Sequence, residues 1–347
     1  MTAVRPASAL EQVATTFTAA ADAAGAVVAR DFRIAGASVR LLFAGEALAE
    51  LLMPALAHVA AHAVERPALT VHLWDSRSTQ TDPPPLPPAP SEGPFGAFYY
   101  YGEPPWRVLY QPGPSALSVF NSDARHAWYW VDRGDNLSHW ESAAPIRHIT
   151  QWWLASRGQQ QVHGGAVGTP DGGVVVVGRG GSGKSTAALS TLDSDLFYAG
   201  DDYVAVELDS RPFVHSLYSS GKVEPHHLER LPHLRRAVWN ADKLETEKAV
   251  VFVHDHWPDR TIAGFPLKAV LVPKVVASRP ESRLAPASRA AALAALAPST
   301  IFQLHPSGKQ ALAAMARVVE RVPTFTLELG SDIPSIPRVI SEFLVQL

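Results

Sequence analysis

A glycine-rich loop is the stretch whose residue types and spacing indicate chemistry most directly. Residues 178–185 read Gly-Arg-Gly-Gly-Ser-Gly-Lys-Ser and match the pattern G-x-x-x-x-G-K-[ST] at every fixed position. Glycines let a backbone approach an anion without a Cβ in the way, and the free N–H groups of such a loop point at phosphate oxygens. We therefore predict a nucleotide phosphate site formed by Gly178, Arg179, Gly180, Gly181, Ser182, Gly183, Lys184, Ser185 and Thr186.

Two side chains of this loop have separate expected roles. Lys184 would reach the β- and γ-phosphates of ATP, and the Ser185 hydroxyl would ligate Mg²⁺. The context agrees with the motif, because four valines at 174–177 predict a buried parallel strand and residues 186–192 predict a short helix. ATP and Mg²⁺ are therefore the expected cofactors. A loop that binds nucleotide only for regulation is the alternative.

An acidic pair follows the loop at a short distance in the sequence. Asp201 and Asp202 come 17 and 18 residues after Lys184 (201 − 184 and 202 − 184), at the end of a strand predicted over 196–198. If the strands are neighbours in the sheet, one carboxylate can hold Mg²⁺, directly or through water. The other can accept the proton of an attacking hydroxyl. The alternative is an exposed turn, because turns favour Gly-Asp-Asp.

Four motifs together resemble the catalytic domain of the HPr serine kinase/phosphorylase family. They are the His-Gly at 163–164, the valine strand, the glycine-rich loop and the Gly-Asp-Asp at 200–202. Residues 214–222 and 293–303 resemble a branch of HPr-kinase-like enzymes that phosphorylate serine on lasso-peptide precursors. The resemblance runs from about residue 146 to the C-terminus. It implies an α/β, P-loop-containing nucleotide-binding domain of the phosphoenolpyruvate-carboxykinase-like fold.

The resemblance also implies roles for single residues. Asp201 would be the base that takes the proton from the acceptor hydroxyl, which leaves Asp202 as the carboxylate of the acidic pair that joins Ser185 on the metal side. His163 matches the active-site histidine of the family's His-Gly motif. A structural histidine at the start of a strand is the alternative for this residue.

Two basic residues and one departure from the family pattern complete the candidate site. Lys222 would add positive charge near the phosphates, with a solvated surface lysine as the alternative. Arg260 is the candidate for the family's later active-site arginine, which stabilises transferring charge. The bifunctional HPr enzymes carry a Glu-Ile-Arg-Gly stretch, whereas this chain reads Tyr-Ser-Ser-Gly-Lys-Val-Glu over 218–224. This departure argues against phosphorolysis and against HPr as the substrate.

The composition restricts the class of protein. A chain of 347 residues with 47% hydrophobic and 18% charged residues is predicted to be globular, with two domains. A net charge of −3 argues against nucleic acid as a partner. The lack of cysteine excludes disulfides, thiol catalysis and cysteine zinc sites. We see no signal peptide and no apolar run long enough for a membrane span, so we predict a cytoplasmic protein without a membrane partner.

Residues 1–141 are predicted to form a smaller α+β domain. Its aromatic-rich part suggests an antiparallel sheet, in which an exposed strand could pair with an extended peptide; aromatics that form the sheet's own core are the alternative. A proline-rich segment at 82–90 is predicted to be a surface loop rather than a docking site. The expected elements are a helix or a loose segment over 1–30, a hairpin over 31–44, a helix over 46–62, a strand over 69–74 and short strands over 95–131.

Residues 142–347 are predicted to form the ATP-binding catalytic domain. Histidines and carboxylates over 254–260 could bind a metal, although a strand-end cluster without metal is favoured. The expected elements are strands over 204–208, 250–253, 269–276 and 324–329, helices over 142–157, 290–296, 310–322 and 334–347, and a surface helix or loop over 225–236.

The resemblance and the motifs favour an ATP-dependent kinase whose acceptor is a serine hydroxyl in a peptide or protein. A homo-oligomer is compatible with the resemblance, because HPr kinases are hexameric. Two alternatives remain open. One is an enzyme for a small metabolite, either a small-molecule kinase or a carboxykinase, and the other is a nucleotide-binding regulatory protein without catalysis.

Overall fold

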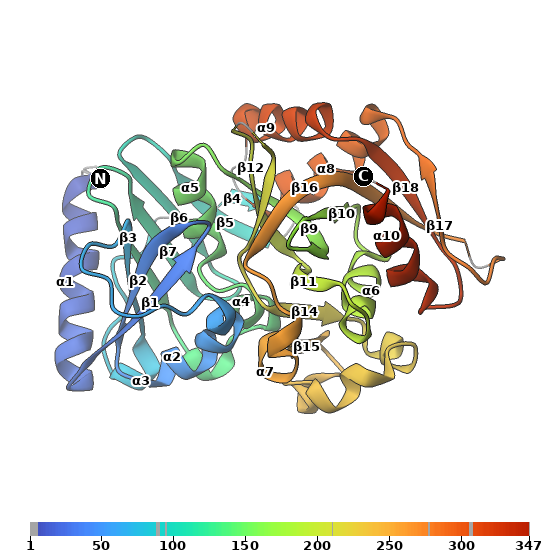
Figure 1. Cartoon of the computed structure of the whole chain (residues 1–347). Helices are drawn as coiled ribbons and strands as arrows, with labels where there is room; N and C mark the ends of the chain where they lie inside the picture. Colours follow the sequence, from blue (N-terminus) through green and yellow to red (C-terminus); the bar gives the residue numbers. More distant parts are fainter. Residues whose placement is uncertain are drawn as a thin grey trace. The chain divides into compact units, whose positions relative to one another are not determined.

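The computed structural model of the chain divides into two compact units, each a mixture of helices and strands (Figure 1). It describes residues 6–87, 91–93, 96–209, 211–276, 278–304 and 308–346. The first unit comprises Met1–Met53 and Ala60–Ser156, and the second comprises Pro54–Val59 and Arg157–Leu347. The predicted boundary at 141/142 therefore differs from this division. The first unit extends to Ser156, and a short segment from early in the chain belongs to the second unit.

The first unit is built on one eight-stranded sheet with the order β1-β2-β3-β8-β7-β6-β5-β4. The predicted hairpin is confirmed, and its turn places Ala35 and Gly36 at φ 46° and 77°. β3 runs parallel to β2 and to β8, and the other pairs are antiparallel. The strands are β1 (Val27–Ile34), β2 (Ala37–Ala44), β3 (Leu69–Asp75), β4 (Ser91–Gly93), β5 (Gly96–Tyr101), β6 (Trp106–Gln111), β7 (Ala116–Asn121) and β8 (His126–Val131).

The aromatic residues of this sheet mostly form its own core. Helix α1 (Pro6–Ala24) packs Phe17 among the buried Trp74 and Trp130, so the N-terminal segment is helical rather than loose. Tyr99, Tyr101 and Tyr110 of β5 and β6 are partly buried against the same cluster. Phe95 and residues 88–90, which belong to the predicted aromatic and proline-rich stretches, lie outside the described residues.

Two predicted helices of the first 157 residues are broken at proline. The helix expected over 46–62 ends early as α2 (Ala47–Leu52) and continues as the 3₁₀ helix η1 (Met53–Val59). The helix expected over 142–157 is divided into α4 (His139–Ala143) and α5 (Arg147–Ser156). Proline has no N–H to donate to the carbonyl four residues before it, so Pro54 and Pro145 interrupt the α-helical bonding. The short helices of this unit are α3 (Ser76–Thr79) and η2 (Gly134–Asn136).

The second unit contains a mixed sheet in which β10 and β16 close a ring of strands. The order is β10-β9-β12-β13-β16-β18-β17, β16 also pairs with β10, and β11 pairs with β9. β10 is parallel to β16 and antiparallel to β9, so the expected parallel strand lies in a mixed sheet. The strands are β9 (Gln160–Thr169), β10 (Gly172–Val177), β11 (Phe197–Gly200), β12 (Tyr203–Glu207), β13 (Phe213–Ser216), β16 (Gly264–Val275), β17 (Arg283–Pro286) and β18 (Thr324–Leu329).

Helices cover both faces of this sheet, and the valine run of β10 alternates between them. Val174 and Val176 pack with residues of α6 (Lys184–Leu189) and α10 (Ser335–Val345). Val175 and Val177 pack with residues of α8 (Arg289–Gln303) and α9 (Gly308–Arg321). A strand that is buried on both faces reads as a continuous apolar run, which explains the four consecutive valines.

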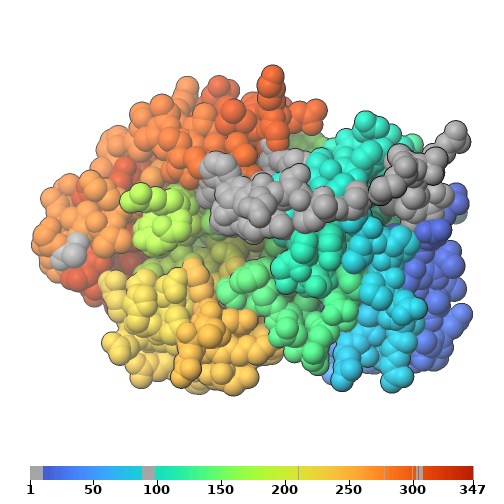
Figure 2. All heavy atoms as spheres, turned by 180° about the vertical axis from the view of Figure 1, so that it is seen from behind, coloured from blue at the N-terminus to red at the C-terminus, as the bar shows by residue number. Residues whose placement is uncertain are grey.

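A smaller two-stranded sheet and several short helices complete the second unit. β14 (Ser220–Val223) pairs with β15 (Ala249–Phe252) in antiparallel fashion. The segment expected over 225–236 is two 3₁₀ helices that lie at the surface, in yellow in Figure 2. The remaining short helices are η3 (Ser190–Asp193), η4 (Pro225–Glu229), η5 (Pro232–Ala237), η6 (Ala241–Lys243), α7 (Val253–His256) and η7 (Pro258–Arg260).

No helix in the described ranges is both long enough and apolar enough to cross a membrane.

Candidate active site

Strand β9 brings the separate motifs together. One edge of β9 pairs with β10, where Gly164 lies opposite Val177, the last residue before the glycine-rich loop. The other edge pairs with β12 and β11, where His163 lies opposite Tyr203. Because neighbouring strands are about 4.8 Å apart, the loop and the acidic pair begin about 10 Å from each other, on either side of residues 163–165.

A glycine after the histidine allows this close arrangement. A Cβ on Gly164 would lie 2.8 Å from the carbonyl oxygen of Val176. The Gly164 N–H donates to the carbonyl of Asp202 at 3.0 Å, which bridges the gap between β11 and β12. The His-Gly motif is therefore explained by packing as well as by chemistry, because a larger residue would push β9 away from β10.

The glycine-rich loop turns sharply between β10 and α6. Gly181 and Gly183 have φ of 73° and 101°, a region that favours glycine. The side chain of Lys184 is 7% exposed and lies along the loop, where Nζ donates to the carbonyls of Gly178 at 2.7 Å and Arg179 at 3.2 Å. Burial lowers the pKa of Lys184, and the charges of the acidic pair oppose this shift.

The loop geometry predicts the effect of a single methyl group. A Cβ on Gly183 would lie 2.3 Å from Leu329 Cδ1, and the positive φ adds backbone strain, so Gly183→Ala should lower stability by about 2 kcal/mol or more. A Cβ on Gly180 meets no atom within 4 Å, so Gly180→Ala is the matched control. Chemical denaturation of both variants measures the difference. Equal stabilities would contradict the loop conformation described here.

Asp201 is a buried carboxyl at the end of β11. It is 1% exposed, and Oδ2 accepts the backbone N–H of Lys222 at 3.0 Å. The other oxygen, Oδ1, is buried without a hydrogen-bond partner in the described part of the chain. Burial, and then the charge of Asp202, raise the pKa of Asp201 to about 7, although hydrogen bonds from Lys222 and Ser185 act in the opposite direction.

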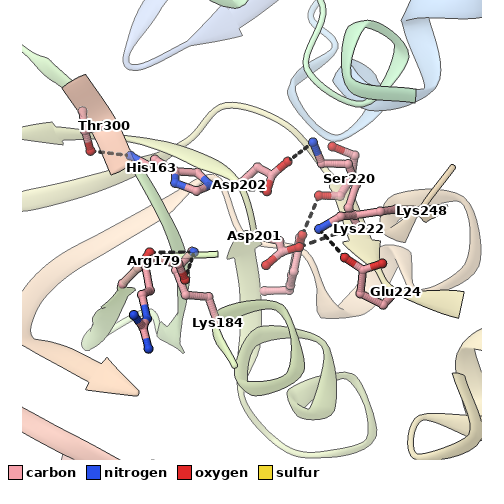
Figure 3. A network of polar contacts seen from close by, with 12 residues as sticks. His163, Arg179, Lys184, Asp201, Asp202, Ser220, Lys222, Glu224, Lys248 and Thr300 are labelled. Carbon is pink, nitrogen blue, oxygen red and sulfur yellow. Dashed lines mark hydrogen bonds and ion pairs between the residues drawn. The ribbon is translucent and has the colours of Figure 1, made fainter. Parts of the chain in front are cut away.

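Asp202 has different neighbours. Its carboxylate forms a close ion pair with the ammonium of Lys222, which projects from β14 (Figure 3). The imidazole Nε2 of His163 lies 3.7 Å from Asp202 Oδ1. Burial alone would raise the pKa of Asp202, but the charge of Lys222 and the contact with His163 outweigh it and hold the pKa well below the ordinary range. Asp202 is therefore ionised at neutral pH, whereas Asp201 is poised to exchange a proton.

His163 joins this network through both its backbone and its ring. Its N–H donates to the Thr300 hydroxyl of α8 at 3.0 Å, and burial lowers the pKa of its imidazole. The ring atom Nδ1 is buried and has no partner among the described residues. The structure thus places His163 against the acidic pair, with one nitrogen still available.

Lys248 is a member of this region that the sequence did not indicate. It precedes β15, pairs with Glu224 at 2.8 Å and is close enough for its charge to act on Lys184 (Figure 3). Lys184 and Lys222 therefore contribute positive charge beside the acidic pair, and Lys248 adds charge that acts on Lys184. No local motif marks Lys248, because it arrives by the pairing of β14 with β15.

The other sequence candidates are Arg260 and the histidines and carboxylates of residues 254–260. Arg260 forms a long, exposed ion pair with Asp195 at 3.9 Å, beside the start of β11, whereas the acidic pair follows its end. The structure therefore does not bring Arg260 into this network, and its catalytic role stays a prediction. Within the described ranges, no group of three or more histidine, cysteine, aspartate or glutamate side chains is arranged to hold a metal, including residues 254–260.

No protein-family model matches the chain, and no curated protein sequence matches it. Among solved structures, the chain is similar to the Hpr(Ser) kinase/phosphatase from Coxiella burnetii, with 12% identity over 54% of this chain and 94% of that chain and a TM-score of 0.29. A likeness this distant carries no argument about function, which rests instead on the geometry of the site.

Proposed function

We propose that the second unit binds ATP with Mg²⁺ and transfers the γ-phosphoryl group to a hydroxyl, specifically a serine hydroxyl of a peptide or protein. The observation that carries this proposal is Asp201. A buried carboxyl with a pKa of about 7 and one unpartnered oxygen is suited to accept a proton at neutral pH. It lies beside a loop whose glycines, lysine and serine suit a triphosphate.

The residues present fit both cofactors. The loop N–H groups and the Lys184 ammonium would bind the phosphates, with Lys184 exchanging the loop carbonyls for phosphate oxygens. Mg²⁺ prefers oxygen ligands, and the Ser185 hydroxyl at the start of α6 supplies one on the side of Asp201. When bound, Mg²⁺ neutralises charge on the phosphates. Asp202 as a further metal ligand stays a prediction, because its carboxylate is paired with Lys222.

The different pKa values of Asp201 and Asp202 assign the two carboxyls different roles in the reaction. Asp201 Oδ1 accepts the proton of the acceptor hydroxyl while the hydroxyl oxygen forms a bond to the γ-phosphorus. The bond from this phosphorus to the β,γ-bridging oxygen breaks, and ADP leaves with that electron pair. Asp202 remains ionised beside Lys222 and keeps the pKa of Asp201 high enough for proton transfer. The lysine charges stabilise the phosphoryl group in transfer.

A transfer assay tests this function. The full chain is incubated with γ-labelled ATP and Mg²⁺ against serine peptides, HPr, free serine and buffer alone, with Asp201→Asn in parallel. Label on a peptide that is lost in the variant would support the proposal. Label on free serine or another metabolite would instead indicate a small-molecule kinase. ATP binding without any transfer would indicate a regulatory nucleotide-binding protein.

The pH dependence of transfer should report the same carboxyl. Because a base must be deprotonated, kcat/KM should fall as pH drops below about 7, the pKa of Asp201. Asp202→Asn removes the neighbouring charge that raises this pKa, so the acidic limb should move to lower pH. Initial rates from pH 5 to 9 measure both profiles. A limb that stays in place in Asp202→Asn would argue against Asp201 as the titrating base.

A further inference from the structure

A second polar side chain leaves β9 on the same face as His163. Gln161 pairs with Ala205 in the register in which His163 pairs with Tyr203. Alternate residues of a strand share a face, so Gln161 and His163 project together, about 7 Å apart along the strand. Val162, which lies between them on the opposite face, belongs to the apolar core that contains residues of α8 and α9.

Gln161 is buried without the hydrogen bonds that its amide requires. The residue is 1% exposed, and neither Oε1 nor Nε2 has a partner among the residues that the structure describes. Buried amides almost always bond both their donors and their acceptor, because leaving them unpaired is costly. The neighbouring side chain across the strand pair is Ala205, which is small. His163 lies on the same face; its Nε2 is 3.7 Å from Asp202 Oδ1, and its Nδ1 has no partner among the described residues.

We propose that Gln161 forms an acceptor subsite that binds a main-chain amide of the polypeptide substrate. This inference rests on the proposed kinase function and names the substrate class of the same site. An extended peptide advances about 3.4 Å per residue, so a peptide with its serine at the acidic pair presents an amide two residues away at the level of Gln161.

The chemistry of the side chain matches a peptide bond. A carboxamide carries one acceptor and two donors, so it can accept a backbone N–H and donate to a backbone carbonyl at once. Being uncharged, it selects neither phosphate nor carboxylate. His163 Nδ1 offers one more polar contact nearer the acceptor residue. The subsite would therefore distinguish a polypeptide from free serine without reading the identity of the neighbouring side chains.

Kinetics on matched variants test the subsite. Gln161→Leu replaces the amide with an apolar side chain of similar size, and Gln160→Leu makes the same change one residue earlier, on the opposite face of β9. The probe is a mixture of ten-residue peptides that each contain one serine. For this mixture, Gln161→Leu should raise KM about tenfold, with kcat changed less than about threefold and the KM for ATP unchanged. Gln160→Leu should leave the peptide KM unchanged.

Two further measurements separate binding from stability. Thermal unfolding of Gln161→Leu should show Tm raised by about 2–4 °C, because the unpaired amide is gone. Peptides in which an ester replaces single amides near the serine should lose affinity for the wild type and not for Gln161→Leu. A lower Tm together with an unchanged peptide KM would show that the amide is satisfied within the fold, and would overturn the inference.

The remaining outcomes distinguish this inference from the proposed function. Transfer by the wild type to free serine and not to peptides would overturn the subsite and leave a hydroxyl kinase standing. If Gln161→Leu and Gln160→Leu transfer to peptides with equal peptide KM values, the subsite is overturned and the protein is still a peptide kinase. If no acceptor is phosphorylated, the proposed function fails, and a lack of peptide binding to the ATP-loaded protein would overturn the subsite as well.

Discussion

Asp201→Asn is expected to reduce phosphoryl transfer by about 10³-fold while ATP binding is retained. The asparagine keeps the size of the side chain and can still accept the Lys222 N–H, but it cannot take a proton from the acceptor hydroxyl. Removal of a general base typically costs 10²- to 10⁴-fold, about 10³ in the middle of that range. Single-turnover transfer rates and equilibrium titration with ATP measure the two effects separately.

The same substitution should stabilise the protein at high pH. The pKa of Asp201 is raised to about 7 in the folded state, so the fold favours the neutral carboxyl. Its ionisation therefore costs stability progressively as pH rises from about 4 to about 7, and the cost is constant above that. At about 1.4 kcal/mol per pKa unit, the gain for Asp201→Asn is on the order of 4 kcal/mol at pH 8 and vanishes near pH 4.

Urea unfolding at these two pH values is the measurement. Thr186→Ala, a change in the neighbouring helix α6 that removes no buried charge, serves as the control whose stability difference should not vary with pH. A variant that is less active and also less stable at pH 8 would mean that Asp201 acts as a structural residue. A variant that is more stable but fully active would show that Asp201 is not the base in the reaction.

Lys222→Met is expected to destabilise the second unit by about 3–5 kcal/mol at pH 8. The ion pair of Lys222 with Asp202 is largely buried, with side-chain exposures of 14% and 18%. Removing one partner of such a pair leaves the other charge buried and uncompensated, which is far more costly than the pair itself. The methionine keeps most of the apolar part of the lysine side chain, so the loss of stability comes from removing the charge and not from a change in side-chain volume.

A double variant provides the control for this prediction. Asp202→Asn removes the orphaned charge, so Lys222→Met with Asp202→Asn should recover most of the lost stability. In the wild type the lowered pKa of Asp202 keeps its stabilising contribution intact down to the unfolded pKa of this carboxyl. In Lys222→Met the charge that lowers this pKa is gone while burial still raises it, so the orphaned carboxylate takes up a proton as pH falls. The deficit of Lys222→Met should therefore shrink as pH falls toward 4. A deficit that is independent of pH and is not rescued would show that Lys222 stabilises by packing alone.

Short sequence patterns correctly predicted the elements of the fold that depend on residues close together in the chain. The valine run predicted β10, the alternation over 69–74 predicted β3, and the small residues at 35–36 predicted the first hairpin, all of which the structure contains. The two helices predicted over 46–62 and 142–157 failed at Pro54 and Pro145, because the pattern of side chains persists although the backbone bond is lost. Short strands such as β13 and β14 were missed for lack of any periodicity of their own.

By itself, the sequence determined that a glycine-rich loop with the phosphate-loop pattern is followed by an acidic pair, because both signals lie in short runs of consecutive residues. The tertiary structure decided how the two carboxyls differ. Adjacent residues at the end of β11 project toward different partners, so Asp202 meets Lys222 and His163 while Asp201 faces Ser185 and keeps one oxygen unpaired. These partners come from β14, β9 and α6, and only strand pairing brings them together. The electrostatic environment of a buried group depends on such distant contacts, which no local pattern encodes.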